Sequence, residues 1–282
     1  MEIRDDGYYI LTEEEKERMI QKAKGRSLAE KNPELAGQWN AEKNGDLRPE
    51  MVTANSHKKV WWKFSYFDNT TGKFWMFIWL ADIASRNNGL GCPYLSGRAV
   101  WEGFNDLQSK YPEIATEWHP TKNGELLPTM VTAKSHKLVW WLLPYDDPIT
   151  GKHFDFEWQA VISSRVGGNG CPYLSNEKVW LGYNDLATTH PNVAKQWHPT
   201  KNGKLNPTDV LAGSDKKVWW YLCYFDVNTG KTHYFEWEAL INKRALRGYG
   251  CPYLSGHAVW QGYNDLATIY PEILSNMKSE IR

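Results

Sequence analysis

The sequence has few cysteines, no excess of charge of either sign and no long apolar run. Its 282 residues include 4 cysteines, and its 33 basic residues are matched by 33 acidic ones. Balanced charge makes no demand for a polyanionic partner, and no apolar run reaches the roughly 18 residues that a membrane span needs. The N-terminal segment is acidic where a secretory signal would be basic. The sequence therefore predicts a cytoplasmic protein with no membrane partner.

Tryptophan and tyrosine, by contrast, are abundant, with 16 and 15 copies, and they recur at a fixed interval. Trp39, Trp118 and Trp197 stand 79 residues apart, as do the Trp-Trp pairs that begin at positions 61, 140 and 219. Three of the cysteines follow at intervals of 79 and 80 residues. Such a period indicates three tandem repeats. Cysteines a whole repeat apart lie beyond the reach of a disulfide.

Each repeat predicts the same series of elements, here numbered for the second. A helical segment over 106–118 leads into the polar turn 119–124. A strand around the Trp pair, a turn at 148–151 and a strand ending at Trp158 then predict a β-hairpin. A Gly-Cys-Pro-Tyr segment and an aromatic linker follow. The pattern predicts an α+β fold.

The linkers carry a tryptophan each, at positions 101, 180 and 260, and no flexible spacer. We therefore expect neighbouring repeats to pack on each other in an elongated array. Thr12 and Glu15 form a capping-box pattern that predicts an N-terminal capping helix. The predicted organisation comprises an N-terminal cap (1–26), three repeats (27–105, 106–184 and 185–264) and a C-terminal capping helix (265–282).

The repeated motifs carry a family resemblance. The string Asn-Asp-Leu-Ala-Thr, the turn Trp-His-Pro-Thr-Lys-Asn-Gly, the strand Lys-Val-Trp-Trp and the segment Gly-Cys-Pro-Tyr resemble the probable zinc-ribbon (treble-clef) repeat family of bacterial and phage proteins. The resemblance covers about residues 27–275. It implies treble-clef-like units, a bacterial or phage origin and a nucleic-acid role, and in the family three cysteines and a histidine hold zinc.

Most of the ligand positions that this resemblance implies are apolar here. The first cysteine, the histidine, the third ligand and the fourth ligand fall in turn on Phe64, Leu143 and Leu222; Phe77, Phe156 and Phe235; Cys92, Cys171 and Cys251; and Leu95, Leu174 and Leu254. A lone thiolate cannot make a tetrahedral site. The sequence therefore predicts no zinc and no cofactor, with each former metal site turned into a small hydrophobic core that includes its cysteine.

A catalytic role has one candidate pair, His119 with Asn123, because some treble clefs are nucleases that use these residue types. The first repeat has Asn40 where the others have His119 and His198. We expect a turn-forming histidine and a protein that is not an enzyme.

Basic residues also recur, and they are the candidate nucleic-acid contacts. They are Lys43, Lys122 and Lys201 in the turn; Lys58, Lys137 and Lys216 before the Trp pair; and Arg86, Arg165 and Arg244 after the hairpin. Turn lysines are often merely solvated, and the arginines could instead bind groups of their own repeat. One tryptophan of each pair should be buried and the other should face outward, where it could stack on a base or anchor a protein.

Two functions follow from these positions. The first is a nucleic-acid-binding repeat module, with DNA favoured over RNA, and the alternative is a protein-binding scaffold or inhibitor. Alignment of the basic residues on one face would favour nucleic acid, and an uncharged patch of exposed aromatics would favour protein. The sequence leaves the oligomeric state open.

Overall fold

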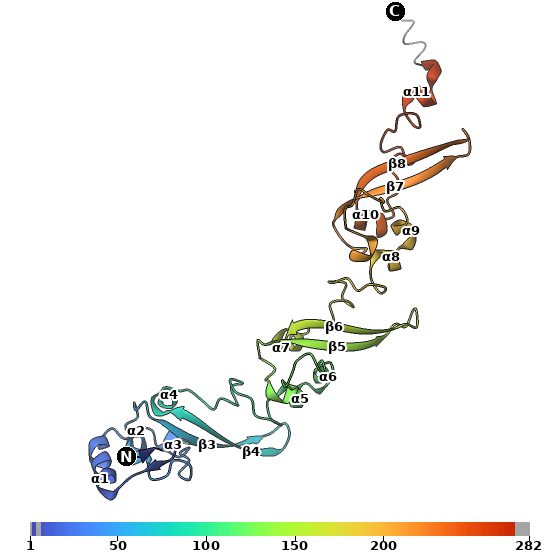
Figure 1. Cartoon of the computed structure of the whole chain (residues 1–282). Coiled ribbons are helices and arrows are strands. Elements are labelled where there is room, and N and C mark those ends of the chain that lie inside the picture. Colours follow the sequence, from blue (N-terminus) through green and yellow to red (C-terminus); the bar gives the residue numbers. More distant parts are fainter. Residues whose placement is uncertain (1, 4–6, 274–282) are drawn as a thin grey trace, which may run out of the picture. The chain divides into compact units, whose positions relative to one another are not determined.

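A computed structural model describes residues 2–3 and 7–273 of the chain (Figure 1). The last part of the predicted C-terminal cap, residues 274–282, lies outside the described residues. Contacts divide the chain into two compact units, Met1–Trp141 with Gln159–Gly167 and Leu142–Trp158 with Gly168–Arg282. The division passes through the second repeat, and each unit is described by itself. The predicted repeat boundaries and the elongated arrangement stay predictions.

The described strands form two-stranded sheets, and three of these sheets are the predicted hairpins. The strands are β1 Glu2–Ile3, β2 Tyr9–Ile10, β3 Lys59–Asp68, β4 Lys73–Asp82, β5 Leu138–Asp146, β6 His153–Val161, β7 Lys217–Asp226 and β8 Lys231–Leu240. Each long hairpin turns at a glycine with φ near +68°, namely Gly72, Gly151 and Gly230. A left-handed backbone is readily adopted by glycine, which explains the Thr-Gly signature of all three turns.

The helices of the described residues are short, apart from the first. They are α1 Glu13–Ala23, α2 Leu28–Lys31, α3 Pro33–Ala36, α4 Ile83–Asn87, α5 Leu107–Lys110, α6 Pro112–Thr116, α7 Ile162–Val166, α8 Leu186–Thr189, α9 Pro191–Ala194, α10 Ile241–Ala245 and α11 Leu266–Ile269. Three 3₁₀ turns, η1 Pro49–Met51, η2 Pro128–Met130 and η3 Pro207–Asp209, precede the hairpins.

The single helix expected over 106–118 is wrong, because the segment forms two helices, α5 and α6. Tyr111 between them has φ −139° and ψ 64°. Proline at the next position disfavours a helical conformation for the residue before it. Asp106 caps α5 by accepting a hydrogen bond from the Ser109 N–H, as Asp185 caps α8, so the predicted caps are confirmed.

The inner face of each hairpin builds the core. In β3–β4, Trp62 pairs with Trp79 and Phe64 with Phe77, so these four side chains share one face. Trp62 and Phe77 are fully buried. Trp39 meets Trp62 edge-on, with 5.8 Å between ring centroids. The prediction that one member of each Trp pair is buried is confirmed, because Trp62, Trp141 and Trp220 are all 0% exposed.

The linker tryptophans complete the core of their own repeat. Trp101 lies 4.7 Å from Tyr94 and 5.4 Å from Phe77 between ring centroids, and Trp260 lies 5.5 Å from Phe235. Our expectation that these indoles would pack neighbouring repeats together is therefore corrected. Burying such rings on a local hairpin gives each repeat a core of its own.

A short third segment pairs with the first strand of each hairpin. The Asn40 N–H donates to the Trp61 carbonyl at 3.0 Å and the Lys63 N–H donates to the Gln38 carbonyl at 2.7 Å. The Asn44 side chain also accepts from the Trp61 N–H and donates to its carbonyl, at 2.7 and 2.8 Å. The same two-way bond joins Asn202 to Trp219. This clamp fixes the outward tryptophan of the pair.

The ends of the described chain differ. The capping box of Thr12 and Glu15 is present, and α1 packs next to η1, as expected for an N-terminal cap. In α11, however, Leu266 is 53% exposed, whereas its counterparts Leu107 and Leu186 are fully buried. The described part of the C-terminal element therefore leaves its apolar side chains uncovered.

Candidate binding surfaces

The former ligand positions separate into a buried group and an exposed one. The phenylalanines at the histidine position are fully buried, and the cysteines are 5–8% exposed. The first-cysteine positions Phe64, Leu143 and Leu222 are half-buried. At the fourth position Leu95, Leu174 and Leu254 are 41%, 37% and 40% exposed. The expected core membership is wrong for these leucines, because the knuckle turns them outward.

This arrangement does not suit a zinc ion. Three of the four positions hold apolar side chains, and zinc needs nitrogen, sulfur or oxygen ligands in a tetrahedral set. Within residues 2–3 and 7–273 no group of three or more His, Cys, Asp or Glu side chains could hold a metal ion. Phe77 instead packs against Tyr94, with 5.4 Å between ring centroids. Aromatic packing occupies the place of the metal centre.

The recurrent arginines are buried, which corrects their assignment as phosphate contacts. Arg86, Arg165 and Arg244 are 6–7% exposed. The Arg86 guanidinium lies between two indoles, 5.2 Å from the Trp62 ring and 5.1 Å from the Trp79 ring. Arg244 lies 5.1 Å from both the Trp220 and the Trp237 ring. A cation between indoles is stabilised by the ring quadrupoles, so these arginines hold the hairpin to the helix after it.

The polar partners of the arginines differ between repeats. Arg86 donates to the Leu90 carbonyl and the Gln38 side chain, and Arg244 donates to the Tyr249 carbonyl and Gln196. Arg165 forms an ion pair with Glu117, at the position of the two glutamines. Burial lowers the pKa of Arg86 and of Arg244, yet a guanidinium stays charged at neutral pH.

The histidines of the polar turn have a structural role. Nδ1 of His119 accepts hydrogen bonds from the N–H groups of Thr121 and Lys122, at 3.2 and 3.0 Å. Nδ1 of His198 does the same in the third repeat, and its Nε2 lies 3.1 Å from a Glu236 oxygen. In the first repeat the Asn40 side chain accepts from the Lys43 N–H at 3.1 Å. The turn-forming interpretation is confirmed.

The turn lysines lie over the outward tryptophans. The amine nitrogens of Lys43, Lys122 and Lys201 are 4.6, 4.7 and 4.4 Å from the ring centroids of Trp61, Trp140 and Trp219. The three indoles are half-buried and the three lysines are exposed. This recurrent Lys–Trp pair is the surface feature that the sequence predicted most closely.

The lysines before the Trp pair do not share one environment. Lys58 is half-buried, whereas Lys137 and Lys216 are exposed. The Lys58 amine lies 5.5 Å from the Tyr9 ring centroid, and burial lowers its pKa. Together with the buried arginines, this leaves the turn lysines as the one predicted basic set that is exposed in every repeat.

The outer face of the first hairpin is apolar. Trp61 pairs with Leu80, Lys63 with Ile78, Ser65 with Met76 and Phe67 with Phe74, and these residues form the surface that we call the β3–β4 outer face. Phe74 is 81% exposed and Met76 51%. The Phe67 and Phe74 rings lie 4.6 Å apart, and no charged side chain of the two strands separates them. Contiguous exposed apolar surface of this kind is typical of interaction sites.

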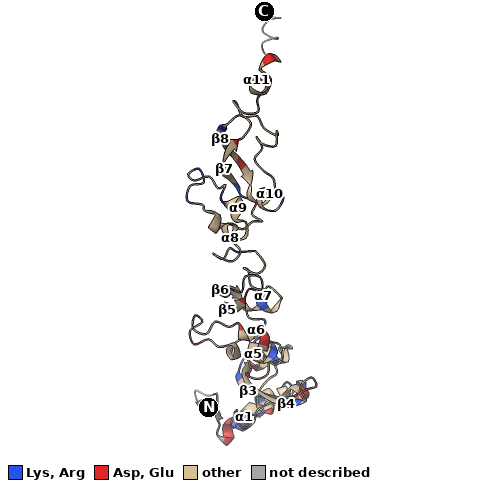
Figure 2. Ribbon diagram, turned by 90° about the vertical axis from the view of Figure 1, so that its right-hand side faces the viewer, with Lys and Arg blue, Asp and Glu red and all other residues tan. Residues whose placement is uncertain are grey.

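The other two hairpins are more polar at the same positions. In β5–β6, His153 replaces Phe74 and lies 2.7 Å from Asp146 and 3.3 Å from Asp155. In β7–β8, Tyr234 stacks on Tyr221, beside the carboxylates of the same strand. Basic and acidic residues are interspersed in the ribbon view (Figure 2).

The β3–β4 outer face was missed from the sequence, although a signal was present. The strand sequence Lys-Phe-Trp-Met-Phe-Ile-Trp-Leu at 73–80 has apolar residues at successive positions, whereas one buried face predicts alternation. The corresponding strand of the second repeat alternates with Asp155 and Glu157.

A family model described as "Probable Treble clef zinc finger domain" matches residues 35–98, 114–177 and 193–257. The chain belongs to this family. The three matches fall on the three repeats, so the tandem array of treble-clef-like units and its α+β class are confirmed. No curated protein shows significant similarity to the chain.

Treble-clef zinc-finger repeats suggest a module that binds nucleic acid or protein. Within the part of the chain that the structure describes, the helices are too short or too polar to cross a membrane. Cytoplasmic location and a bacterial or phage origin stay predictions.

Proposed function

We propose that this treble-clef array is a protein-binding module that docks its partner on the β3–β4 outer face. The observation that carries the proposal is the exposed apolar surface of Phe67, Phe74, Met76 and Leu80, which are 43–81% exposed. The fold does not require these residues, because the second hairpin keeps the same buried Trp and Phe with His153 and Asp155 on its outer face. A binding role explains apolar residues that folding does not.

The charges around this face select the partner. Lys59, Lys63 and Lys73 are exposed. Both carboxylates of the hairpin have hydrogen-bond partners: Asp68 accepts from the Thr71 hydroxyl at 2.9 Å, and Asp82 accepts from the Ser85 N–H at 2.8 Å. A complementary partner is a protein surface with an apolar centre and carboxylates at its rim.

The proposed module acts by binding alone. The imidazoles of His119 and His198 are buried and accept the turn hydrogen bonds. Nδ1 is therefore taken up in both, which supports a role in positioning the turn and the Lys–Trp pair above the strand.

Nucleic acid, with DNA favoured, is the second candidate, and the Lys–Trp pair favours it. A lysine over an exposed indole in every repeat resembles the charge and stacking surface that single strands use. Lys201, however, also forms an ion pair with Glu236, which offsets its charge in the third repeat. The buried arginines weaken this candidate further.

Exchange of the outer face between repeats tests the proposal. Phe74→His with Met76→Asp gives the first hairpin the outer residues of the second, which the fold already accommodates there. A photo-cross-linking amino acid at position 74, with position 153 as the matched control, identifies the partner in the native host. Binding of that purified partner is then measured by calorimetry.

We expect the double substitution to weaken partner binding by roughly a hundredfold, as loss of two interface anchors does, while the melting temperature stays close to that of the unmodified chain. Unchanged affinity would reject the docking face. If no protein cross-links at position 74 and Lys43→Gln weakens binding of single-stranded DNA at low salt, the nucleic-acid candidate replaces this one.

A further inference from the structure

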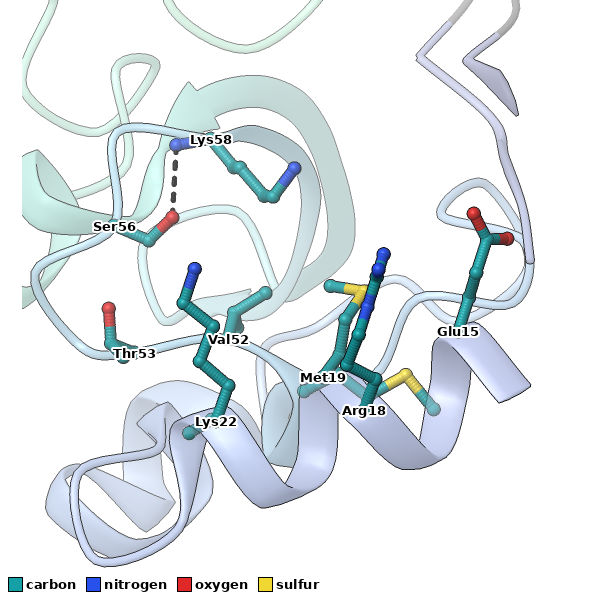
Figure 3. A pocket seen from close by; sticks show the side chains of 10 residues that line it. Glu15, Arg18, Met19, Lys22, Val52, Thr53, Ser56 and Lys58 are labelled. Atoms are coloured by element: carbon teal, nitrogen blue, oxygen red, sulfur yellow. Dashed lines mark hydrogen bonds between the residues drawn. The ribbon is translucent and has the colours of Figure 1, made fainter. Parts of the chain in front are cut away.

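A hollow of about 570 Å³ lies between α1 and the segment that leads into β3. Glu15, Arg18, Met19 and Lys22 line it from α1, and Met51, Val52, Thr53, Ser56 and Lys58 are among the residues that line it from the other side. Its size falls in the range of small-molecule sites. Figure 3 shows Arg18 and Lys22 rising from α1 on the side where Lys58 extends.

Positive charge predominates in this hollow. Arg18 and Lys22 stand four residues apart on α1, which places them on one face of the helix. Lys58 is the third cation that lines the hollow, and its side chain is half-buried. The one lining carboxylate, Glu15, accepts a hydrogen bond from the Thr12 N–H at 3.0 Å as part of the helix cap.

The rest of the lining combines hydroxyls with apolar surface. The side chains of Thr53 and Ser56 line the hollow beside Lys58, and the Lys58 N–H donates to the Ser56 hydroxyl at 3.2 Å. Met19 and Met51 pack against the core of the first repeat and form apolar lining. A ligand with an anionic head and an apolar body would meet suitable groups at both ends.

The corresponding hollow of the third repeat shows what α1 contributes. It has a volume of about 640 Å³, and Val210, Ser214 and Lys216 line it at the positions of Val52, Ser56 and Lys58. The knuckle loop around Glu177 takes the place of α1 there, and Asp209 adds a second carboxylate. The excess of cations is therefore specific to the first repeat and comes from α1.

We propose that the hollow beneath α1 binds a phosphate monoester carried on an apolar body, with Arg18, Lys22 and Lys58 holding the phosphoryl group. Three cations against one carboxylate leave an excess of about two positive charges. That excess matches a phosphate monoester, whose charge near neutral pH is about −1.5 to −2. The methionines contact the apolar body. This site is separate from the β3–β4 outer face and does not depend on the proposed function.

The test uses phenyl phosphate as the probe and amide chemical shifts of the full chain as the readout. We expect saturable shifts confined to residues 12–24 and 51–58. Arg18→Gln and Lys58→Gln should each weaken binding by about tenfold, as loss of a charge-assisted hydrogen bond does. Lys216→Gln, the matched change in the third repeat, should leave the affinity unchanged.

Three outcomes would overturn the proposal: no saturable shift at millimolar phenyl phosphate, equal weakening by Lys216→Gln and Lys58→Gln, or phenol binding as tightly as phenyl phosphate. Inorganic phosphate serves as the further arm, and we expect it to bind at the same residues more weakly than phenyl phosphate. Equal affinity would overturn the role of the methionines. Arg18 is exposed on α1, so Arg18→Gln keeps the test valid if Lys58→Gln disturbs the fold.

Discussion

In the first hairpin Trp62 and Phe77 are fully buried, and in the second Trp141 and Phe156 are buried to the same extent. On the outer faces, Phe74 of the first hairpin is 81% exposed, whereas the second has His153 between two aspartates at that position. The inner residues are held by the requirement of a core. The outer residues are free of it, so their difference indicates where the repeats differ in function.

The largest expected effect separates the two members of a Trp pair. Trp62→Ala should destabilise the first repeat by roughly 3–5 kcal/mol, because it empties the centre of an aromatic core. Trp61→Ala should cost about 1 kcal/mol, because that indole is half-buried under Lys43. Native-state hydrogen exchange in the first repeat measures both, since repeats can unfold separately. Equal costs would reject the assignment of inner and outer faces.

The arginines give the next largest difference between repeats. Arg165→Gln should cost roughly 3 kcal/mol, because it leaves the Glu117 carboxylate without its cation. Arg86→Gln should cost about 1–2 kcal/mol, because its partner Gln38 is neutral. Denaturant unfolding of the two variants measures the difference.

The double variant Arg165→Gln with Glu117→Gln serves as the control for this pair. It should recover most of the extra loss, because no unpaired carboxylate then remains. A double variant as unstable as Arg165→Gln alone would show that the ion pair is not the source of the difference.

Two leucines of the second and third repeats sharpen the contrast between core and surface. Leu186 is fully buried and Leu174 is 37% exposed. Leu186→Ala should cost roughly 2–5 kcal/mol, and Leu174→Ala should cost under about 1 kcal/mol. Thermal unfolding of the two variants compares them. A large loss at Leu174 would restore the hydrophobic-core interpretation of the fourth ligand position.

The smallest effect concerns pH and the second hairpin. Hydrogen bonds from Asp146 and then Asp155 raise the pKa of His153 above its ordinary value of 6.5. Because the folded pKa is raised, the stabilisation is full below about pH 6.5 and is lost as pH rises through the folded pKa. His153→Gln should remove this dependence. The nuclear magnetic resonance titration of His153 checks it, and a pKa at or below 6.5 would contradict it.

The fixed spacing of the tryptophans was enough to predict the hairpins, their turns and the buried member of each Trp pair. A period of 79 residues places equivalent side chains in equivalent positions, and alternation along a strand does the rest. Proline at 112 also carried the signal for the break between α5 and α6, which the helical pattern concealed.

Other features depend on contacts that no local pattern contains. Arg86 is buried because Trp62 and Trp79 meet across the hairpin and α4 carries the arginine between them. Leu95 was placed in a core because its position was carried over from a zinc ligand, yet an apolar side chain there has no metal to draw it inward. The hollow beneath α1 needs a helix and a segment more than thirty residues away in the sequence.

The asparagine clamp on Trp61 and Trp219 also bears on how tandem copies avoid misassembly. Neighbouring repeats this similar could exchange strands during folding, and an open hairpin edge could pair with another chain. The Asn44 and Asn202 side chains occupy both backbone groups of the outward tryptophan. They take up hydrogen-bonding groups that an incoming strand would need, so each hairpin is protected along its first strand as soon as its own turn has formed.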